Sequence, residues 1–369
     1  MRPRERVLAT LQRQPVDRIP SYDELYDLEA EKKFTPQYTG IKSYGTMPAA
    51  REAAPDEVIA MLQFMDCDIA EAATGRLRTH ILEDNAEEMV FAYENGAIWC
   101  LDKAASQTVA VSLPLESKQD PADVHMPDPD DTDRYQSVEE KARYLREQGY
   151  FTLAKVHGFF SGAWYLFRNL DDLFMDMIDD PGFVHAIVDR IGDYNYRTAR
   201  QLLARGVDCI LFGDDMGSST GLLFSPKFYV EFFQGWHKRM ADLCHEYGGY
   251  LQIHSHGNIN RIMPQLMATG VDILNPVGPT DGMDLEGLLQ EYGDRAVFAG
   301  GISKRIGEMK REELARHLEE VISVGKRYGS YMFRGEGGIP PTMSQEMFRF
   351  YMDTSHRLRT MDADSEPHG

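Results

Sequence analysis

The sequence predicts an α/β protein with a single (β/α)₈ TIM barrel. From residue 150 onward, the chain repeats a short β-rich apolar run followed by an amphipathic helical segment, the pattern of parallel strands with crossover helices. Six such runs occur there, and one or two strands in the first half would bring the count to eight. A doubly wound sheet is the alternative, but the GxGxxG or GxxxxGK turn that it would need is not present.

The first residues predict an N-terminal helical and loop excursion. Residues 4–14 have the apolar spacing of a helix, and prolines then lead into an extended segment at residues 19–22, a candidate first strand. Residues 28–55 are polar and punctuated by proline and glycine, which predicts a long loop of the kind that often covers a site.

An antiparallel insertion follows. Residues 88–113 alternate apolar and polar side chains around the step Asn95-Gly96, which predicts a β-hairpin. Residues 115–135 are acidic and contain prolines, as a solvated connector does, and they lead into a helix expected at residues 138–148.

The regular repeats begin after this connector. Each predicted strand ends in a glycine or in a residue with a functional side chain, as strands do at the active-site face of a barrel. We expect one domain over residues 1–369, with residues 1–149 as an N-terminal part, 150–357 as the repeats and 358–369 as a frayed tail. The strand sequences are FTLAKVHG, CILFGDD, YLQIHSHG, DILNP, AVFAGG and YMFRGE.

Composition and charge exclude several classes of partner. The chain has 369 residues, 43% hydrophobic and 27% charged, so it can bury a large core as a globular protein does. The 59 acidic residues outnumber the 39 basic ones and give a net charge of −20, which repels nucleic acids and anionic membranes. We therefore expect no nucleic acid or membrane partner, whereas a homodimer is compatible with the sequence.

The cysteines and the first residues indicate a cytoplasmic protein. The cysteines lie far apart without a CxxC pair, as reduced thiols do, and the N-terminus lacks the apolar core of a signal peptide. No apolar run reaches about 18 residues. The cysteines are Cys67, Cys100, Cys209 and Cys244.

Two histidines close one predicted strand. His254 and His256 are two residues apart, a spacing that places both side chains on one face of a strand. Two imidazoles in one cavity form half of a divalent-metal site, with zinc as the first candidate. The candidates for a further ligand are Asp214, Asp215 and, as the one we expect, Glu336. Alternatively, one histidine is buried and hydrogen-bonded while the other faces solvent beyond the strand.

Carboxylates close two further strands. Asp214 and Asp215 follow an apolar run, and because neighbouring strand residues point in opposite directions, we expect only one of them to face the cavity as a catalytic group. Both could instead serve the following turn and a helix N-terminus. Glu336 precedes two glycines, where a backbone can approach a ligand, or it is an ordinary turn carboxylate.

Other strand ends supply candidate catalytic and substrate-binding residues. His157 is a catalytic candidate if the strand register holds, and Tyr22, Asn275 and Arg334 are candidates for binding substrate. Asn275 could also simply start a turn before proline. An aromatic group after His157 forms either a flat apolar wall for a ring system or part of the helix-to-barrel core: Phe159, Phe160, Trp164 and Tyr165.

Several segments together resemble the uroporphyrinogen decarboxylase superfamily over nearly the whole chain. The resemblance implies a single (β/α)₈ barrel with its cleft at the carboxyl ends of the strands. The segments are RERVLATLQRQPVDRIP, FGDDMGSSTGLLFSPKFYVEFF, HSHGNINRIMPQLMATGVDILNPV, YGDRAVFAGGIS and GGIPPTMSQEMF.

Departures from the family patterns separate its branches. True decarboxylases carry an arginine-rich motif of the type FMRQAGR, which is missing from residues 20–60, and a histidine in the late stretch that here reads Gly337-Gly338-Ile339-Pro340. The corrinoid- and thiol-dependent methyltransferases bind zinc through HxC and a late cysteine. This chain matches the first ligand with His254, has His256 in place of the cysteine, and has Gly337 in place of the late one.

The resemblance therefore implies the methyltransferase branch. We expect a metal-dependent transfer of a methyl group between a small methoxy- or methylamine-type substrate and a corrinoid held by a partner protein. The first alternative is a decarboxylase of a tetrapyrrole or a smaller carboxylate, for which Arg334 and Arg168 are the candidate cavity arginines. The second alternative is a barrel that binds a tetrapyrrole or corrinoid without catalysis.

Overall fold

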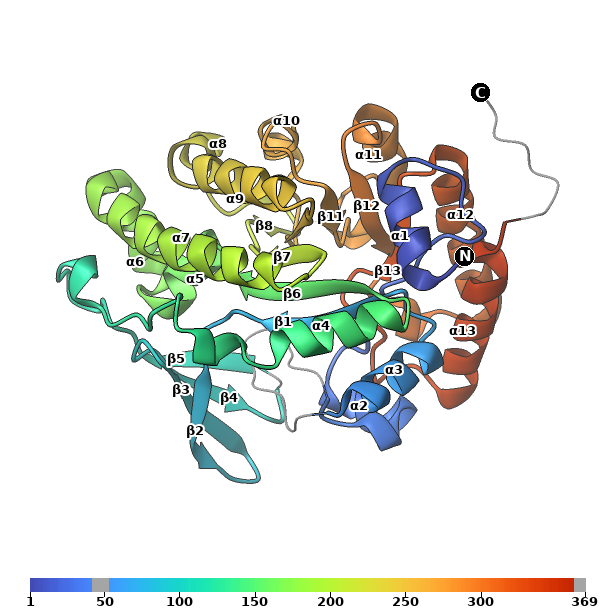
Figure 1. The fold of residues 1–369 in the computed structure, drawn as a ribbon, viewed down its shortest axis with the longest axis horizontal. Helices are drawn as coiled ribbons and strands as arrows, with labels where there is room; N and C mark the ends of the chain where they lie inside the picture. Colours follow the sequence, from blue (N-terminus) through green and yellow to red (C-terminus); the bar gives the residue numbers. More distant parts are fainter. Residues whose placement is uncertain (42–52, 106, 362–369) are drawn as a thin grey trace.

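A curled parallel sheet forms the centre of the molecule, with helices packed along its outer side (Figure 1). The computed structural model describes residues 1–41, 53–105 and 107–361. The sheet has seven strands in the order β1-β6-β7-β10-β11-β12-β13. All six strands predicted in the second half are present, so the α/β class is confirmed. The strands are β1 (Ile69–Thr74), β6 (Phe151–His157), β7 (Cys209–Gly213), β10 (Tyr250–His254), β11 (Ile273–Asn275), β12 (Val297–Ile302) and β13 (Tyr331–Gly335).

The helices between the strands form because their apolar side chains share a stripe that faces the sheet. In α7 (Pro181–Ala204), Asp180 caps the N-terminus by accepting a hydrogen bond from the Phe183 N–H, and residues such as Ile187 and Ile191 are buried. Further helices are α1 (Pro3–Leu11), α4 (Val138–Glu147), α5 (Phe160–Leu166), α6 (Leu170–Asp179), α8 (Pro226–Phe228), α9 (Gln234–Glu246), α10 (Met263–Met267), α11 (Leu285–Tyr292), α12 (Arg311–Tyr328) and α13 (Gln345–Arg359). Within the described ranges, each helix is too short or too polar to cross a bilayer.

The expected first strand is not a regular strand of this sheet. Residues 19–25 run extended beside β13, where the Tyr22 N–H donates to the Phe333 carbonyl at 3.1 Å. On the other side, the N–H of Asp68, just before β1, donates to the Ser21 carbonyl at 2.7 Å. The segment contains a proline, which cannot donate to a strand ladder. Residues 19–25 thus hydrogen-bond at both edges of the seven-stranded sheet, beside β13 and just before β1.

The predicted loop at residues 28–55 is partly helical. Asp27 caps α2 (Leu28–Phe34) by accepting from the Ala30 N–H at 2.8 Å, and Phe34 stacks on Phe348 of α13 with ring centroids 4.5 Å apart. This local cap and the aromatic packing explain why a helix forms in a polar stretch. The elements that follow are η1 (Pro36–Tyr38) and α3 (Pro55–Phe64).

Two expectations fall partly outside the described residues. The middle of the loop, residues 42–52, lies there, and so do residues 362–369 of the predicted tail. Residues 358 and 359 belong to α13.

The antiparallel insertion is confirmed at Asn95-Gly96 but is larger than predicted. It is a four-stranded sheet in the order β2-β3-β4-β5, and Gly96 adopts φ +93°, which suits glycine in a tight hairpin turn. The inner face packs on α5, where Trp99 stacks on Tyr165 with centroids 3.8 Å apart. The strands are β2 (Thr79–Asp84), β3 (Glu88–Tyr93), β4 (Ile98–Asp102) and β5 (Gln107–Ser112).

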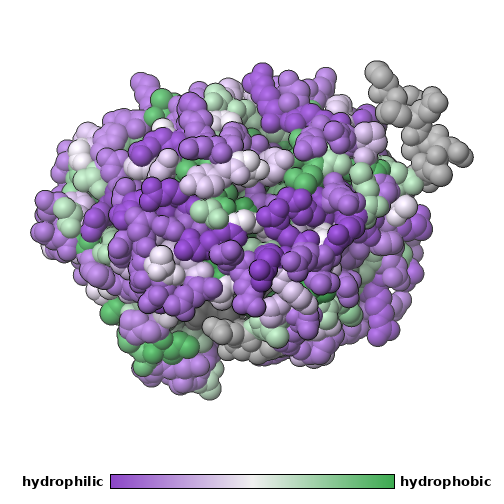
Figure 2. Space-filling model, in the orientation of Figure 1, coloured by the Kyte–Doolittle hydropathy of each residue, from purple (hydrophilic) through white to green (hydrophobic). Residues whose placement is uncertain are grey.

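The edge strands of this sheet expose apolar side chains. Figure 2 shows a mostly hydrophilic face with apolar residues gathered at the lower left, over the antiparallel sheet. The exposed residues there are Ile81, Leu82, Val109 and Val111.

Candidate active site

The interior of the curled sheet changes from apolar to polar along the strands. A small apolar cluster fills its N-terminal end and includes Val7 and Leu11 of α1, which closes that end. Side chains two residues apart on a strand share a face. Polar side chains therefore follow the cluster toward the carboxyl ends of the strands: Lys155 after Leu153, His254 after Gln252, Asn275 after Ile273 and Arg334 after Met332.

His254 and His256 come together at the carboxyl end of β10. Their ring centroids lie 4.6 Å apart with an interplanar angle of 84°. The Nε2 atom of His254 lies 3.7 Å from Oδ1 of Asp215, and the side chains of these two residues are 21% and 49% exposed. Three titratable groups therefore meet at a surface that solvent can reach.

Of the two aspartates, the structure places only Asp215 beside these histidines. Its Oδ1 accepts a hydrogen bond from the His256 N–H at 2.8 Å. Asp214 is fully buried and accepts from the Ser161 N–H at 2.7 Å and from His237 Nε2 at 3.1 Å. The opposite directions of neighbouring residues explain the division, and Asp214 holds the start of α5 instead of facing substrate.

A pair of carboxamides lies behind His254. Gln252 Nε2 donates to Asn275 Oδ1 at 2.7 Å, and Asn275 Nδ2 approaches His254 Nδ1 at 2.8 Å. Gln252 and Asn275 are 1% and 0% exposed. Asn275, predicted to bind substrate, therefore contacts Nδ1 of His254, whereas Nε2 of the same ring faces Asp215.

His254 is a neutral imidazole at neutral pH. Burial lowers its pKa to about 3, and the nearby His256 ring and Arg334 act in the same direction, while Asp215 opposes the shift. A neutral ring carries its one proton on either Nδ1 or Nε2, so it can donate a hydrogen bond from only one of them.

Arg334 and Tyr22 lie together on the β13 side of the interior. The guanidinium of Arg334 stacks over the Tyr22 ring at 4.5 Å and donates to Glu24 at 2.5 Å. Its Nη1 atom is buried and has no hydrogen-bond partner among the described residues. Arg334 could therefore donate to a bound group, as its predicted role in substrate binding requires.

One charged pair in the interior was not anticipated from the sequence. Lys155 Nζ lies 2.8 Å from Glu71 Oε2, and the two side chains are 13% and 25% exposed. The signal was available, because a lysine within the apolar run FTLAKVHG and a glutamate within IAEAAT are unusual in buried strands.

Glu336 is engaged elsewhere and does not complete the predicted metal site. Its Oε1 accepts from Thr280 Oγ1 at 2.5 Å and lies 3.2 Å from Lys304 Nζ, and its side chain is fully buried. Across the described ranges, no group of three His, Cys, Asp or Glu side chains is arranged to hold an ion. The two histidines supply half of a metal site, and the triad His254, His256 and Glu336 does not fit one.

His157 and Arg168 are held by structural contacts. The His157 Nε2 accepts a hydrogen bond from the Leu77 N–H at 2.8 Å, so the ring fixes the chain that enters the antiparallel sheet. Burial, assisted by the charge of Arg76, places the pKa of His157 well below its usual value. Arg168 pairs with Asp176 at 2.9 Å on the helical layer.

The predicted aromatic wall belongs mainly to the core. Phe159 and Phe160 are fully buried, and Phe160 packs edge-on against Phe224 with centroids 4.8 Å apart. Trp164 and Tyr165 contact Trp99 of the antiparallel sheet. The aromatic stretch therefore joins α5 to its neighbours.

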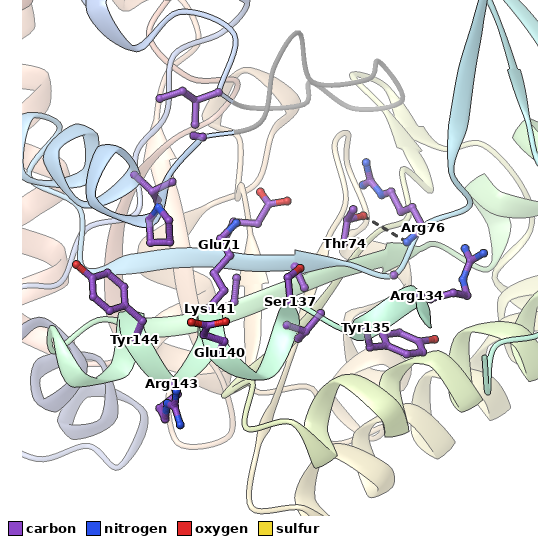
Figure 3. Close-up of a pocket in the computed structure, with 18 of the residues that line it drawn as sticks. Glu71, Thr74, Arg76, Arg134, Tyr135, Ser137, Glu140, Lys141, Arg143 and Tyr144 are labelled. Atoms are coloured by element: carbon purple, nitrogen blue, oxygen red, sulfur yellow. Dashed lines mark hydrogen bonds between the residues drawn. The ribbon is translucent and has the colours of Figure 1, made fainter. Parts of the chain in front are cut away.

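A cavity of about 1110 Å³ lies beside β1 and reaches the interior at Tyr22 and Glu71. Figure 3 shows Glu71 of β1 and Lys141 and Tyr144 of α4 among the side chains that line the cavity. The described lining includes neither His254 nor His256. We take the histidines as the candidate site, because His254, His256 and the half-exposed Asp215 meet there.

Comparison with known proteins identifies the family. Residues 101–358 match the profile described as uroporphyrinogen decarboxylase (URO-D). The chain belongs to the URO-D family. No curated protein matches its sequence.

Solved structures extend the likeness in fold. A methyltransferase from Methanosarcina mazei is 15% identical, with 97% of this chain and 99% of that chain covered at a TM-score of 0.67. A D-psicose 3-epimerase from Clostridium cellulolyticum H10 is 11% identical over 60% of this chain and 81% of that chain, at a TM-score of 0.37. At these identities, the comparison with the methyltransferase shows a shared fold over nearly the whole chain.

Proposed function

We propose that this URO-D family protein is a methyltransferase that acts on a small methoxy- or methylamine-type substrate. The observation that carries the proposal is an interior in which Lys155 pairs with Glu71 and Arg334 pairs with Glu24. In such an interior both cations are paired with carboxylates, so it suits a small substrate with at most one charge better than one with several carboxylates. The likeness in fold to the Methanosarcina methyltransferase supports this reaction class.

The proposed chemistry uses His254 as a hydrogen-bond donor. When the bond between the methyl group and its oxygen or nitrogen breaks, the electron pair stays on that heteroatom. A neutral His254 donating from Nε2 would stabilise the developing charge without giving up its proton. The leaving atom finally takes a proton from solvent, which reaches the site at the half-exposed Asp215.

Two partners of the reaction belong to the proposal. A corrinoid held by a partner protein would supply the acceptor or donor of the methyl group. A divalent metal, zinc first, would be held by His254 and His256 alone, since Glu336 is held by Lys304. It would require Nε2 of His254 to carry no proton. Because the predicted triad does not fit, no chemical step here depends on that metal.

We also infer that the fold is a closed barrel. Residues 19–25 would take the eighth strand position, since they hydrogen-bond to β13 on one side and to the residue before β1 on the other. The polar side chains would then surround one lumen.

The test of the proposed function is methyl transfer with free cobalamin as the probe. The purified protein is mixed with cob(I)alamin and with methanol, a methoxylated aromatic or a methylamine, and formation of methylcobalamin is followed by its visible spectrum. We expect the wild type to accelerate the reaction and His254→Ala to lose roughly 10²- to 10³-fold in rate. An equally active His254→Ala variant would contradict the proposal.

A decarboxylase is the second candidate, and the buried Nη1 of Arg334 favours it. This donor could bind a substrate carboxylate. Turnover of uroporphyrinogen, in the absence of any methyl transfer and unaffected by a chelator, would establish that alternative. If neither reaction occurs and cobalamin or a porphyrin binds, the protein is a binding barrel.

A further inference from the structure

The two carboxamides behind His254 form a directional chain of hydrogen bonds. Gln252 Nε2 donates to Asn275 Oδ1 at 2.7 Å, and Asn275 Nδ2 lies 2.8 Å from His254 Nδ1. An amide nitrogen can only donate, so Nδ1 of the histidine must accept in this arrangement. The single proton of the neutral ring then lies on Nε2, the nitrogen that faces Asp215 at 3.7 Å.

The chain can also run in the opposite direction. If both carboxamides rotate by about 180°, the His254 Nδ1–H donates to Asn275 Oδ1, and Asn275 Nδ2 donates to Gln252 Oε1. Nε2 then presents a lone pair toward Asp215. Because both amides are buried, a rotation of one alone would set two donors or two acceptors against each other, which is costly away from water.

We propose that Gln252 and Asn275 are positioning residues that determine which nitrogen of His254 carries the proton. With the amides oriented as in this structure, Nε2 is a donor on the side of the ring that faces Asp215. With both amides reversed, Nε2 is an acceptor, able to act as a base or as a ligand to an electrophile. The inference rests on the proposed function in taking Nε2 as the atom that meets substrate, but its readout requires no turnover.

The test is the tautomer of His254, measured by NMR. The full-length protein is labelled with ¹⁵N and ¹³C at histidine, and the His254 signal is assigned by its loss in His254→Gln. In the wild type at neutral pH, we expect the proton-coupled nitrogen to be Nε2. If the proton of the wild-type ring is found on Nδ1, this measurement alone overturns the proposal, and no variant of Gln252 or Asn275 is needed.

Two variants then test whether the amides control the tautomer. Asn275→Asp replaces the donor at Nδ1 by an acceptor, and Gln252→Glu replaces the donor to Asn275 by an acceptor. Each should move the coupled proton from Nε2 to Nδ1. Gln345→Glu, which introduces the same change at an exposed position on α13, is the matched control and should leave the signal in place.

The outcomes separate this inference from the proposed function. If circular dichroism shows that both variants are folded and the proton stays on Nε2, the two carboxamides do not set the tautomer and the proposal fails. If the proton moves to Nδ1 in the variants but the wild type shows no methyl transfer, the control of the tautomer by Gln252 and Asn275 is supported and the proposed reaction fails. Because the wild-type measurement is decisive by itself, a variant that does not fold leaves the proposal testable.

Discussion

Two neighbouring aspartates just beyond β7 each lie beside a histidine, and the two aspartate–histidine pairs differ in exposure. In the buried pair, His237 Nε2 lies 3.1 Å from Asp214 Oδ2, and both side chains are 0% exposed. In the open pair, His254 Nε2 lies 3.7 Å from Asp215 Oδ1, with side chains 21% and 49% exposed. The two aspartates are neighbours in the sequence, so the difference arises from the opposite directions of their side chains.

The two pairs differ in how many of their hydrogen-bonding atoms are already used, and this difference distinguishes a structural pair from a candidate catalytic one. Asp214 accepts hydrogen bonds from the backbone N–H groups of Phe159 and Ser161 and lies in hydrogen-bond contact with His237. The Nδ1 atom of His237 is in turn hydrogen-bonded to the Tyr229 hydroxyl. The open pair keeps Nε2 and a carboxylate within reach of solvent. The buried pair is therefore expected to control stability, and the open pair to control activity.

The largest expected effect is on stability. Asp214→Ala leaves two backbone donors and a histidine without their acceptor in a buried region, which should lower the free energy of unfolding by about 3–5 kcal/mol. Urea denaturation followed by circular dichroism measures this. A loss below about 1 kcal/mol would show that the buried pair is not structural.

The neighbouring residue should behave in the opposite way. Asp215→Asn should reduce methyl transfer about 10- to 100-fold, equivalent to roughly 1.4–2.7 kcal/mol, because the charge beside His254 is lost. Since the side chain is half exposed, stability should change by less than about 0.5 kcal/mol. A destabilised variant with unchanged turnover would reverse the assignment of the two aspartates.

A third histidine extends the comparison to pH. His157 is buried and its pKa is well below the usual value, so the folded ring stays neutral where the unfolded chain takes up a proton. Its stability contribution is complete above the unfolded pKa of about 6.5 and is lost as the pH falls below it, by up to about 1.4 kcal/mol per unit. His157→Gln should reduce the slope of unfolding free energy between pH 6.5 and 5 by up to this amount.

The matched control for this experiment is His80→Gln, at an exposed position on β2. A slope that does not change in His157→Gln would mean that this ring is protonated as easily in the folded protein as in the unfolded chain.

The smallest effect concerns the hydroxyl behind the buried pair. Tyr229→Phe removes the 2.9 Å hydrogen bond to His237 Nδ1 and should cost about 0.5–1.5 kcal/mol in unfolding free energy, with methyl transfer unchanged. Thermal denaturation and the cobalamin assay would be compared on the same samples. A clear loss of turnover would link the buried pair to the chemistry.

The sequence predicted the parts of the site that depend on local spacing. The interval between His254 and His256 brought the two rings together, and the opposite directions of neighbouring residues left only one aspartate beside them. The strands carrying them were recognised from runs of apolar residues that end in polar ones. The catalytic and metal-binding roles of these side chains remain predictions.

The parts that depend on contacts distant in sequence were not predictable. Glu336 is held by Lys304 and Thr280 from other loops, and Lys155 meets Glu71 across two strands. His157 binds a backbone N–H from the segment leading to the insertion. Such pairings require the topology to be known, because single residues carry no signal of their partners.

The N-terminal segment has a consequence for the order of assembly. Glu24 pairs with Arg334, and Asp23 with Tyr351, at separations of 310 and 328 positions. During synthesis, residues 19–25 emerge first but must wait until β13 and α13 have been made before they find these contacts. A nascent chain that lacks β13 and α13 therefore keeps one edge of the parallel sheet exposed, and chaperones would act on it at that stage.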